Sequence, residues 1–382
     1  MGTLNRSGLA QLRAVLQSHV DDQRIPGAVA VVALGGHVEL SEALGRQDPA
    51  AGTPMKTDSI FRIYSMTKPL VSLVTLMLAE EGRLQLGDPV SRHLPEFAGQ
   101  QVAVEEGGTV RLQPARREAT VQDLLRHTAG LTYEFLGSSA VQRQYGAADI
   151  ASRSRSNAEF CKVLAALPLA HQPGSCWEYS RATDVLGALL EVVSGRPLGA
   201  LLQERVLGPL GMKDTEFAVP KDQWTRIAEP FANDPDSGQP VAMLDGREVP
   251  RFESGGGGLL STAGDYVRFL QFMRNGGMLD GCRLVSRKTI AWMTSDHLGA
   301  IPVQGDLLLP GYGCGLGFAV RTHAGLAPQP GSPGQYFWSG IGGTSFFVDP
   351  AEDLFALLLT QAPGQRIYYR NLFRQLVYAA LD

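Results

Sequence analysis

The pattern of hydrophobic and polar residues predicts strands at both ends of the chain. Apolar residues at helical spacing within residues 1–23 predict an amphipathic helix. Two strand patterns, 27–36 and 37–45, meet at Gly35-Gly36 and predict an antiparallel hairpin. A nearly all-apolar helix, expected to be buried, ends at Gly82. Strand patterns return in residues 312–320, 335–350 and 353–361, before a final amphipathic helix over 366–381.

The middle of the chain has a different pattern. Short helical segments closed by glycines alternate with long loops rich in Gly, Pro and Ser, and Thr120 with Asp123 predicts a helix cap. We therefore expect a mixed α/β (α+β) fold, with one antiparallel sheet flanked by helices and formed by residues 1–85 and 285–382. Residues 86–284 would form a second, mostly helical domain, and the active site would lie in the cleft between the two.

Composition narrows the possible partners. The 382 residues are 44% hydrophobic and 19% charged, with a net charge of −4, which provides no field for nucleic acid. Four cysteines and seven histidines are dispersed without metal-ligand spacing, so we expect neither disulfides nor a metal site. No apolar run is long enough to span a membrane, and no signal-peptide pattern opens the sequence. These features favour a cytoplasmic protein acting on a small molecule, and they leave its oligomeric state open.

The segment SMTK places a serine three residues before a lysine where a helix is expected to begin. Residues i and i+3 of a helix share a face, with Cβ atoms roughly 5–6 Å apart. Ser65 is thus either a simple helix cap or a nucleophile activated by Lys68. A lysine within a buried helix is costly unless it has a function, which favours the second interpretation.

Two further stretches carry candidate chemistry. Tyr179 lies in a loop just before a helix, where a phenol beside a lysine ammonium ionises more easily and can take a serine proton. The segment Trp338-Ser339-Gly340 follows a predicted strand, and its glycine allows a ligand to approach the backbone. Each stretch alone is more simply explained by packing or by a glycine-rich bulge.

In this order, SMTK, YSR (179–181) and WSG (338–340) resemble the motifs of the serine β-lactamase and penicillin-binding protein superfamily. The likeness is greatest to class C β-lactamases and the related family VIII carboxylesterases. The phrases LLRHTAGL, QPGSCWEYS, GGGGLLSTAGDYVRF and VLGPLGMKDT extend it over nearly the whole chain. The resemblance implies a β-lactamase-like fold and an acyl-enzyme mechanism without a metal or organic cofactor.

The resemblance also assigns roles to individual residues. Ser65 would be the nucleophile, Lys68 its proton-handling partner, and Tyr179 the general base and later the acid toward the leaving group. The backbone N–H groups of Ser65 and Ile341 would form the oxyanion hole. The residues expected to bind substrate are Trp338, Ser339, Gly340 and Arg181.

Two departures from the family pattern decide the expected substrate. Arg181 replaces the asparagine of the β-lactamase YxN motif, and Trp338 replaces the cationic residue of the third motif. Trp338 offers no charge to a carboxylate, although Arg181 would compensate if it points inward. A tryptophan here resembles the family VIII esterases, so we expect a serine carboxylesterase that hydrolyses carboxylic esters with short acyl chains.

Three alternatives within enzymes remain: a class C-like β-lactamase, a D-aminopeptidase or amidase, and an acyltransferase. An ordinary α/β-hydrolase is not indicated, because no serine lies in a GxSxG motif. A non-catalytic penicillin-binding-like module is a further alternative, which the intact set of Ser65, Lys68 and Tyr179 disfavours.

Overall fold

An antiparallel sheet joins the two ends of the chain. The computed structural model describes residues 2–107 and 109–382, and over these residues eight strands form one sheet in the order β10-β11-β12-β13-β14-β1-β2-β3. Its strands are β1 (Gly27–Leu34), β2 (His37–Asp48), β3 (Thr53–Pro54), β10 (Tyr312–Cys314), β11 (Ala319–Arg321), β12 (Tyr336–Ser339), β13 (Ser345–Asp349) and β14 (Leu354–Thr360). Strands from both ends of the sequence thus pair through β1 and β14, and the expected mixed α/β fold is confirmed.

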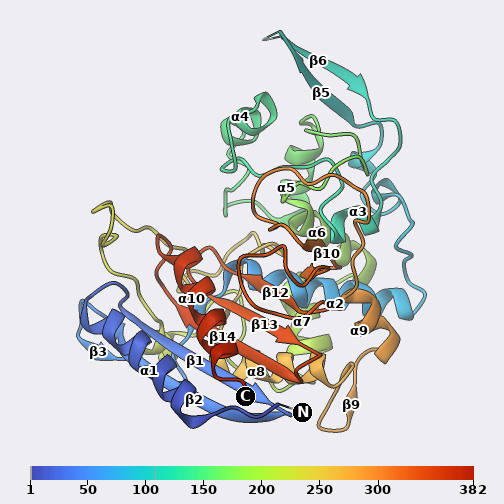
Figure 1. Ribbon diagram of the computed structural model, residues 1–382. Coiled ribbons are helices and arrows are strands. Elements are labelled where there is room, and N and C mark those ends of the chain that lie inside the picture. The colour runs from blue at the N-terminus through green and yellow to red at the C-terminus, as the bar shows by residue number, and fades with distance from the viewer. Residues whose placement is uncertain (1, 108) are drawn as a thin grey trace.

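Helices cover both faces of this sheet. The first helix, α1 (Arg6–Asp21), and the last, α10 (Arg366–Ala379), pack against each other and on the front of the sheet, while α8 (Ala263–Arg274) packs behind β1 and β14 (Figure 1). The other helices are α2 (Lys68–Glu80), α3 (Val121–Leu125), α4 (Ala140–Ala147), α5 (Asn157–Ala165), α6 (Ala182–Ser194), α7 (Leu198–Leu202) and α9 (Arg287–Met293).

The hairpin at the centre of the sheet forms where the sequence predicts it. Gly35 and Gly36 connect β1 to β2 with φ of 59° and 84°, a backbone region in which a side chain would be strained. Residues of β1 are buried on both faces, which explains its continuous apolar sequence. The strong local pattern and the matching turn therefore fix the register of the strands.

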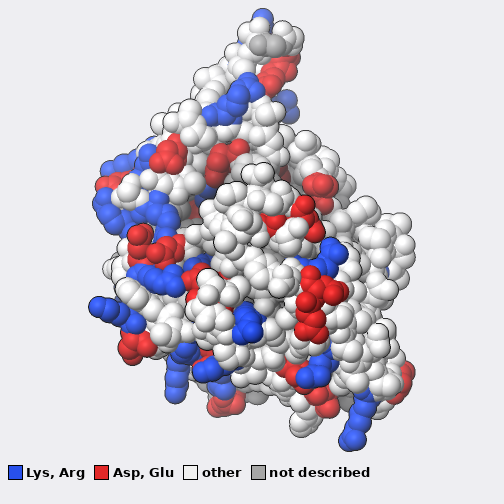
Figure 2. Space-filling view, turned by 90° about the vertical axis from the view of Figure 1, so that its left-hand side faces the viewer, with Lys and Arg blue, Asp and Glu red and all other residues white. Residues whose placement is uncertain are grey.

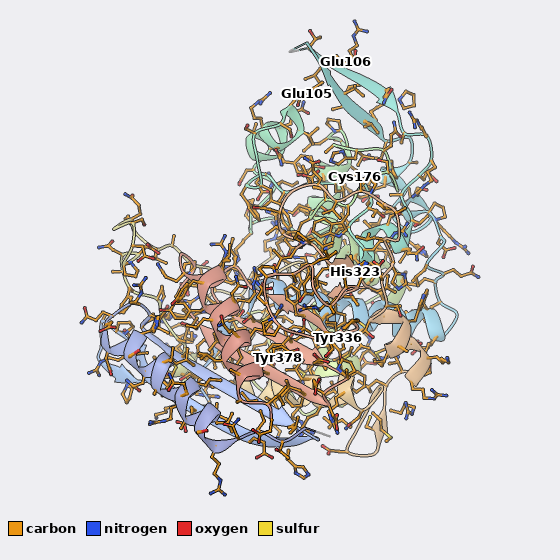
Figure 3. All side chains as sticks on the ribbon, in the orientation of Figure 1. Glu105, Glu106, Cys176, His323, Tyr336 and Tyr378 are labelled. Atoms are coloured by element: carbon orange, nitrogen blue, oxygen red, sulfur yellow. The ribbon has the colours of Figure 1, made fainter. Side chains whose placement is uncertain are left out.

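The region between β3 and β10 is mostly helical, but it departs from the predicted pattern. A two-stranded hairpin of β5 (Gln101–Glu106) and β6 (Thr109–Pro114) projects from it, with Glu105 and Glu106 near its tip (Figure 3). Helix α4 lies in a stretch, residues 134–157, whose sequence has no helical pattern of apolar residues. Its start has a complete capping box between Ser139 and Gln142, which its weak hydrophobic pattern does not reveal. Short pairs β4 (Phe61–Arg62) with β7 (Leu260–Ser261) and β8 (Met278–Leu279) with β9 (Cys282–Arg283) complete the strands.

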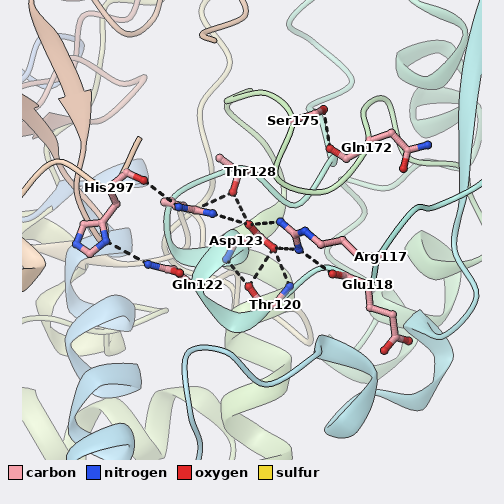
Figure 4. A network of polar contacts seen from close by, with 10 residues as sticks. Arg117, Glu118, Thr120, Gln122, Asp123, Thr128, Gln172, Ser175 and His297 are labelled. Atoms are coloured by element: carbon pink, nitrogen blue, oxygen red, sulfur yellow. Dashed lines mark hydrogen bonds and ion pairs between the residues drawn. The ribbon is translucent and has the colours of Figure 1, made fainter. Parts of the chain in front are cut away.

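A buried carboxylate fixes the start of α3. Asp123 accepts hydrogen bonds from the backbone N–H and hydroxyl of Thr120, from the hydroxyl of Thr128, and from the guanidinium groups of Arg117 and Arg126 (Figure 4). The Thr120–Asp123 cap predicted from the sequence is part of this network. The network holds the chain that leads from α3 into the cavity described below.

The face of the molecule in Figure 2 is charged but mixed in sign. On the face in Figure 2, basic and acidic side chains are interspersed. Among the described residues no single helix has the length and apolar composition to cross a membrane, although α6 and the segment Leu198–Leu207 meet these criteria as a bent pair.

Candidate active site

A cavity of about 440 Å³ lies where the sheet meets the helical region. Its wall includes Ser65, Tyr179, Arg181 and Ile341, together with the third-motif segment 338–340. The structure therefore brings the candidate residues of three distant sequence stretches to one site. Residues 134–157 add Phe135, Leu136, Ala151 and Arg153 to the wall.

Ser65 lies in a tight turn before the buried helix, and not at the cap of that helix. A 3-10 turn, Tyr64–Thr67, precedes α2, and neither helical segment has a side-chain cap hydrogen bond. Tyr64 has a φ of 44°, which is strained for an aromatic residue. Its hydroxyl accepts the backbone N–H of Leu244 at 2.9 Å and anchors this conformation. The interpretation of Ser65 as a simple helix cap is therefore wrong.

Lys68 is fully enclosed at the first position of α2. Its Nζ donates to the Gly256 carbonyl at 2.6 Å, to Tyr133 Oη at 3.0 Å and to Ser65 Oγ at 3.3 Å. Burial lowers the pKa of Lys68 to about 7, with the nearby Asp184 carboxylate opposing the shift and Arg181 adding to it. The amine is thus available in both charge states near neutral pH.

Tyr179 lies against Ser65 on the other side. Its hydroxyl donates to Ser65 Oγ at 2.7 Å, and its ring lies 4.5 Å from Lys68 Nζ. Burial raises the pKa of Tyr179 well above its ordinary value, so the phenol is protonated at neutral pH. The neighbouring His127 ring, 4.9 Å away, is also buried; burial and then the Lys68 charge hold its pKa well below the usual range. The neutral His127 contacts Ser180 Oγ at 3.2 Å, which fits a structural role.

The expected oxyanion donors are free of protein acceptors. Within the described part of the chain, neither the N–H of Ser65 nor that of Ile341 donates a hydrogen bond. A side chain at Gly340 would meet the Ile63 carbonyl oxygen at 2.4 Å, so only glycine fits between β12 and the turn that carries Ser65. The third motif is thereby held against the first.

Trp338 and Arg181 give the cavity an apolar wall and a neutralised cation. The Trp338 indole is 8% exposed and packs against the Tyr179 ring at 5.4 Å between centroids. Arg181 faces the cavity but pairs with both Glu134 and Asp184 and stacks on Tyr133 at 4.8 Å. Burial opposes its charge, yet these neighbours, Asp184 foremost, raise its pKa. Arg181 is therefore engaged by the protein itself.

Three residues at the site were missed by sequence reasoning. Tyr133 Oη accepts a hydrogen bond from Lys68 Nζ, and so does the carbonyl of Gly256. Asp184 in turn accepts from the Gly256 N–H at 2.9 Å and from Ser254 Oγ at 2.5 Å. These bonds fix Gly256 within the glycine run 255–258, and three glycines of the run line the cavity. In the sequence, Tyr133 follows the phrase LLRHTAGL by two residues and Gly256 lies in the run GGGG, whereas no quoted phrase contains Asp184.

Comparisons with known proteins agree with this geometry. The model of the family described as Beta-lactamase matches residues 12–379.

The chain belongs to the beta-lactamase family.

Within this family the chain resembles esterases. It is 36% identical over 375 residues to Esterase EstB of Burkholderia gladioli, covering 92% of this chain and 90% of that protein. It is 35% identical to Protein Rv1367c of Mycobacterium tuberculosis, with 91% and 89% covered. The solved structure of EstCE1, described as a hydrolase with promiscuous acyltransferase activity, matches with a TM-score of 0.81 at 28% identity and covers 97% of this chain and 99% of that one. The expected resemblance to family VIII esterases, and the expected class of serine hydrolase, are confirmed.

The described residues were compared with the side-chain clusters that hold metal ions in proteins. Residues 2–107 and 109–382 contain no cluster of three or more His, Cys, Asp or Glu placed to hold a metal ion. The donors around Ser65 are a lysine, two tyrosines and backbone groups, which suit proton transfer and anion stabilisation.

Proposed function

We propose that this protein is a serine carboxylesterase that hydrolyses small carboxylic esters through an acyl-enzyme intermediate formed on Ser65. The observation that carries the proposal is the position of Ser65 Oγ, within hydrogen-bond distance of both Tyr179 Oη and Lys68 Nζ at the wall of a partly apolar cavity. A weak nucleophile becomes reactive when proton acceptors are held this close.

In the first half of the reaction, Ser65 Oγ attacks the ester carbonyl carbon. Its proton passes to the neutral amine of Lys68, directly or through the Tyr179 hydroxyl, because a pKa of about 7 leaves a large fraction of this amine unprotonated. The N–H groups of Ser65 and Ile341 stabilise the oxyanion. When the tetrahedral intermediate collapses, the C–O bond to the alcohol breaks, and Tyr179 gives its proton to the departing oxygen while Lys68 reprotonates the phenol.

In the second half, water takes the place of the alcohol. It loses a proton to the same Tyr179–Lys68 pair as it attacks the acyl carbonyl, and Ser65 Oγ leaves as the protonated hydroxyl. The sequence-based prediction made Tyr179 the base itself. Because burial keeps its phenol protonated, we propose that Tyr179 relays the proton and that Lys68 stores it.

The residues at the second and third motifs favour esters over lactams. Trp338 replaces a cation with an indole, and Arg181 is paired with Glu134 and Asp184, so neither position offers a free charge to an antibiotic carboxylate. The two esterase relatives, EstB and EstCE1, support ester cleavage. A cavity of about 440 Å³ that is shared by the acyl and alcohol groups favours short acyl chains.

The proposal is tested with 4-nitrophenyl butyrate and a chromogenic cephalosporin side by side. We expect the ester to be hydrolysed much faster than the lactam, and Ser65→Ala to abolish both. Ser72→Ala is the matched control, because Ser72 is buried on α2 but does not line the cavity. Unchanged ester hydrolysis in Ser65→Ala would overturn the mechanism, and rapid lactam turnover without ester cleavage would overturn the substrate class.

A further inference from the structure

The cavity contains arginines that no carboxylate neutralises. Arg153, Arg366 and Arg370 all line it. Within residues 2–107 and 109–382, no Asp or Glu oxygen lies within ion-pair distance of any of the three. Arg366 donates to the Pro363 carbonyl and Arg153 to the Asp245 carbonyl, which leaves their charges uncompensated.

Arg370 has the most constrained position of the three. It projects from α10 and donates to Ser339 Oγ at 2.8 Å, within the third motif. Its guanidinium carbon lies 5.8 Å from the Phe337 ring centroid. Burial, together with the positive charges of Arg374 and Arg366, lowers the pKa of Arg370 to about 10, so it remains charged at neutral pH. A partly buried cation among other cations is costly, and an incoming anion would relieve that cost.

Neighbouring residues do not neutralise the positive charge of these three arginines. Behind Arg370, Arg374 stacks on Phe337 and donates to Tyr312 Oη, and its buried Nε has no partner. Near Arg153, Asp245 and Glu248 act only at a distance, and burial, the larger effect, lowers the pKa of Arg153. By contrast, Arg181 is paired with two carboxylates. Of the four arginines that line the cavity, it is therefore the one whose charge is neutralised.

We propose that the preferred substrates are esters that carry a carboxylate, or a similar compact anion, which Arg370 binds with help from Arg153 and Arg366. This inference rests on the proposed esterase function and specifies its substrate class. A guanidinium binds a carboxylate through two parallel hydrogen bonds, and it does so most strongly when partly withdrawn from water. The anion would replace the missing acidic side chains, while the apolar wall at Trp338 takes the uncharged part of the ester.

Two matched substrate pairs test the proposal and locate the acid. The first pair, the mono-4-nitrophenyl ester of glutaric acid and the 4-nitrophenyl ester of glutaramic acid, differs only on the acyl side. The second pair, 4-carboxyphenyl butyrate and 4-carbamoylphenyl butyrate, differs only on the alcohol side. We expect kcat/KM to be at least about tenfold higher for the acid in one pair, as expected for a charge-assisted pair. Raising the ionic strength should reduce this preference, since salt screens the attraction.

Substitutions then assign the preference to the arginines. Arg370→Gln should reduce the acid-to-amide ratio of kcat/KM toward one, Arg153→Gln should reduce it in part, and Arg370→Lys should retain part of it. Arg287→Gln, an exposed arginine on α9 outside the cavity, is the control that removes one charge and should leave the ratio unchanged. Because the ratio is measured within each variant, a general loss of activity does not imitate the effect.

The outcomes separate this inference from the proposed function. If no ester of either pair is hydrolysed, the esterase proposal fails. If acids and amides are hydrolysed equally well by the unaltered protein, or if the ratio persists in Arg370→Gln and Arg153→Gln alike, the esterase proposal stands and the anion site is refuted. Should Arg370→Gln not fold, Arg153→Gln and the salt dependence still decide the matter.

Discussion

At the scale of single residues, the charge state of Lys68 should control activity. The neutral amine accepts the proton of Ser65, and the pKa of Lys68 is lowered to about 7 by burial. Below this pH the ammonium form predominates, so kcat/KM for 4-nitrophenyl butyrate should fall about tenfold per pH unit and level off above it. Measuring kcat/KM at pH values below and above 7 checks this expectation. A kcat/KM that does not change across neutral pH would contradict it.

Two neighbours should move that profile in opposite directions. Asp184 raises the pKa of Lys68 and Arg181 lowers it. We therefore expect Asp184→Asn to shift the acid limb to lower pH and Arg181→Gln to shift it to higher pH. A shift in the same direction in both variants would show that another group is being titrated.

Tyr133 offers a second test at this scale. Its hydroxyl lies 3.0 Å from Lys68 Nζ, and we expect it to orient the amine toward Ser65. Tyr133→Phe should lower kcat by roughly tenfold with little change in KM, consistent with the loss of one hydrogen bond to a charged group. Tyr145→Phe is the matched control, since this buried hydroxyl makes no hydrogen bond to Lys68 within the described residues. Equal effects of the two substitutions would assign Tyr133 a packing role only.

The sequence indicated some of these residues and not others. Ser65 and Lys68 are separated by a spacing with a local meaning, and Tyr179 lies in a recognisable motif. Gly256 and Asp184 act on Lys68 only after the chain has folded, because Gly256 is 188 residues away from the lysine that it accepts from. Whether Arg181 is paired likewise depended on Glu134, 47 residues earlier in the chain. Contacts of this range have no periodic signal.

At the scale of elements, the start of α3 should be a point of stability. Burial opposes ionisation of Asp123, but hydrogen bonds from Arg117, Thr128 and Thr120 outweigh it and lower the pKa of Asp123 to about 2. A carboxylate whose pKa is lowered by folding stabilises the protein fully at pH values above its pKa in the unfolded chain, which is near 4. This stabilisation is lost as the pH falls from about 4 toward 2, the pKa in the folded protein. The contribution is roughly 2 kcal/mol at neutral pH.

Asp123→Asn should therefore lower the free energy of unfolding by about 2 kcal/mol or more at pH 7, and by less at pH 3. Urea unfolding at the two pH values measures this difference. Glu118→Gln is the control, because its exposed side chain makes no contact in the network of Figure 4. A loss that is the same at both pH values would mean that the charge of Asp123 contributes nothing.

Elements with strong periodicity were the ones that could be predicted. β1 and α2 are buried along almost their whole length, so their sequences are apolar throughout. The β5–β6 hairpin projects away from the core, and β6 is exposed at every position, so packing selects no pattern there. Helix α4 is short, and its capping box is its clearest signal. Where burial does not constrain the side chains, the sequence leaves the element undetermined.

At the scale of the whole molecule, the two ends of the chain depend on each other. β1 and β14 pair over seven positions from Ala28 with Thr360 to Leu34 with Leu354. Next to this sheet, α2 packs against α6 and α7 of the helical region, and its residues from Lys68 to Leu78 are all buried. The predicted division at residue 85 thus separates the helical region from a helix that it packs around.

This arrangement predicts that the helical region is not autonomous. A fragment of residues 86–284 lacks α2, so the apolar faces of α6 and α7 have no partner and the fragment should remain without fixed packing. We expect it to bind a hydrophobic dye and to unfold without a cooperative transition, whereas the full chain should give coincident urea transitions by circular dichroism and tryptophan fluorescence. A fragment of residues 55–284, which restores α2, should show less dye binding than 86–284. Cooperative unfolding of 86–284 alone would establish it as an independent domain and make α2 a helix of the sheet domain only.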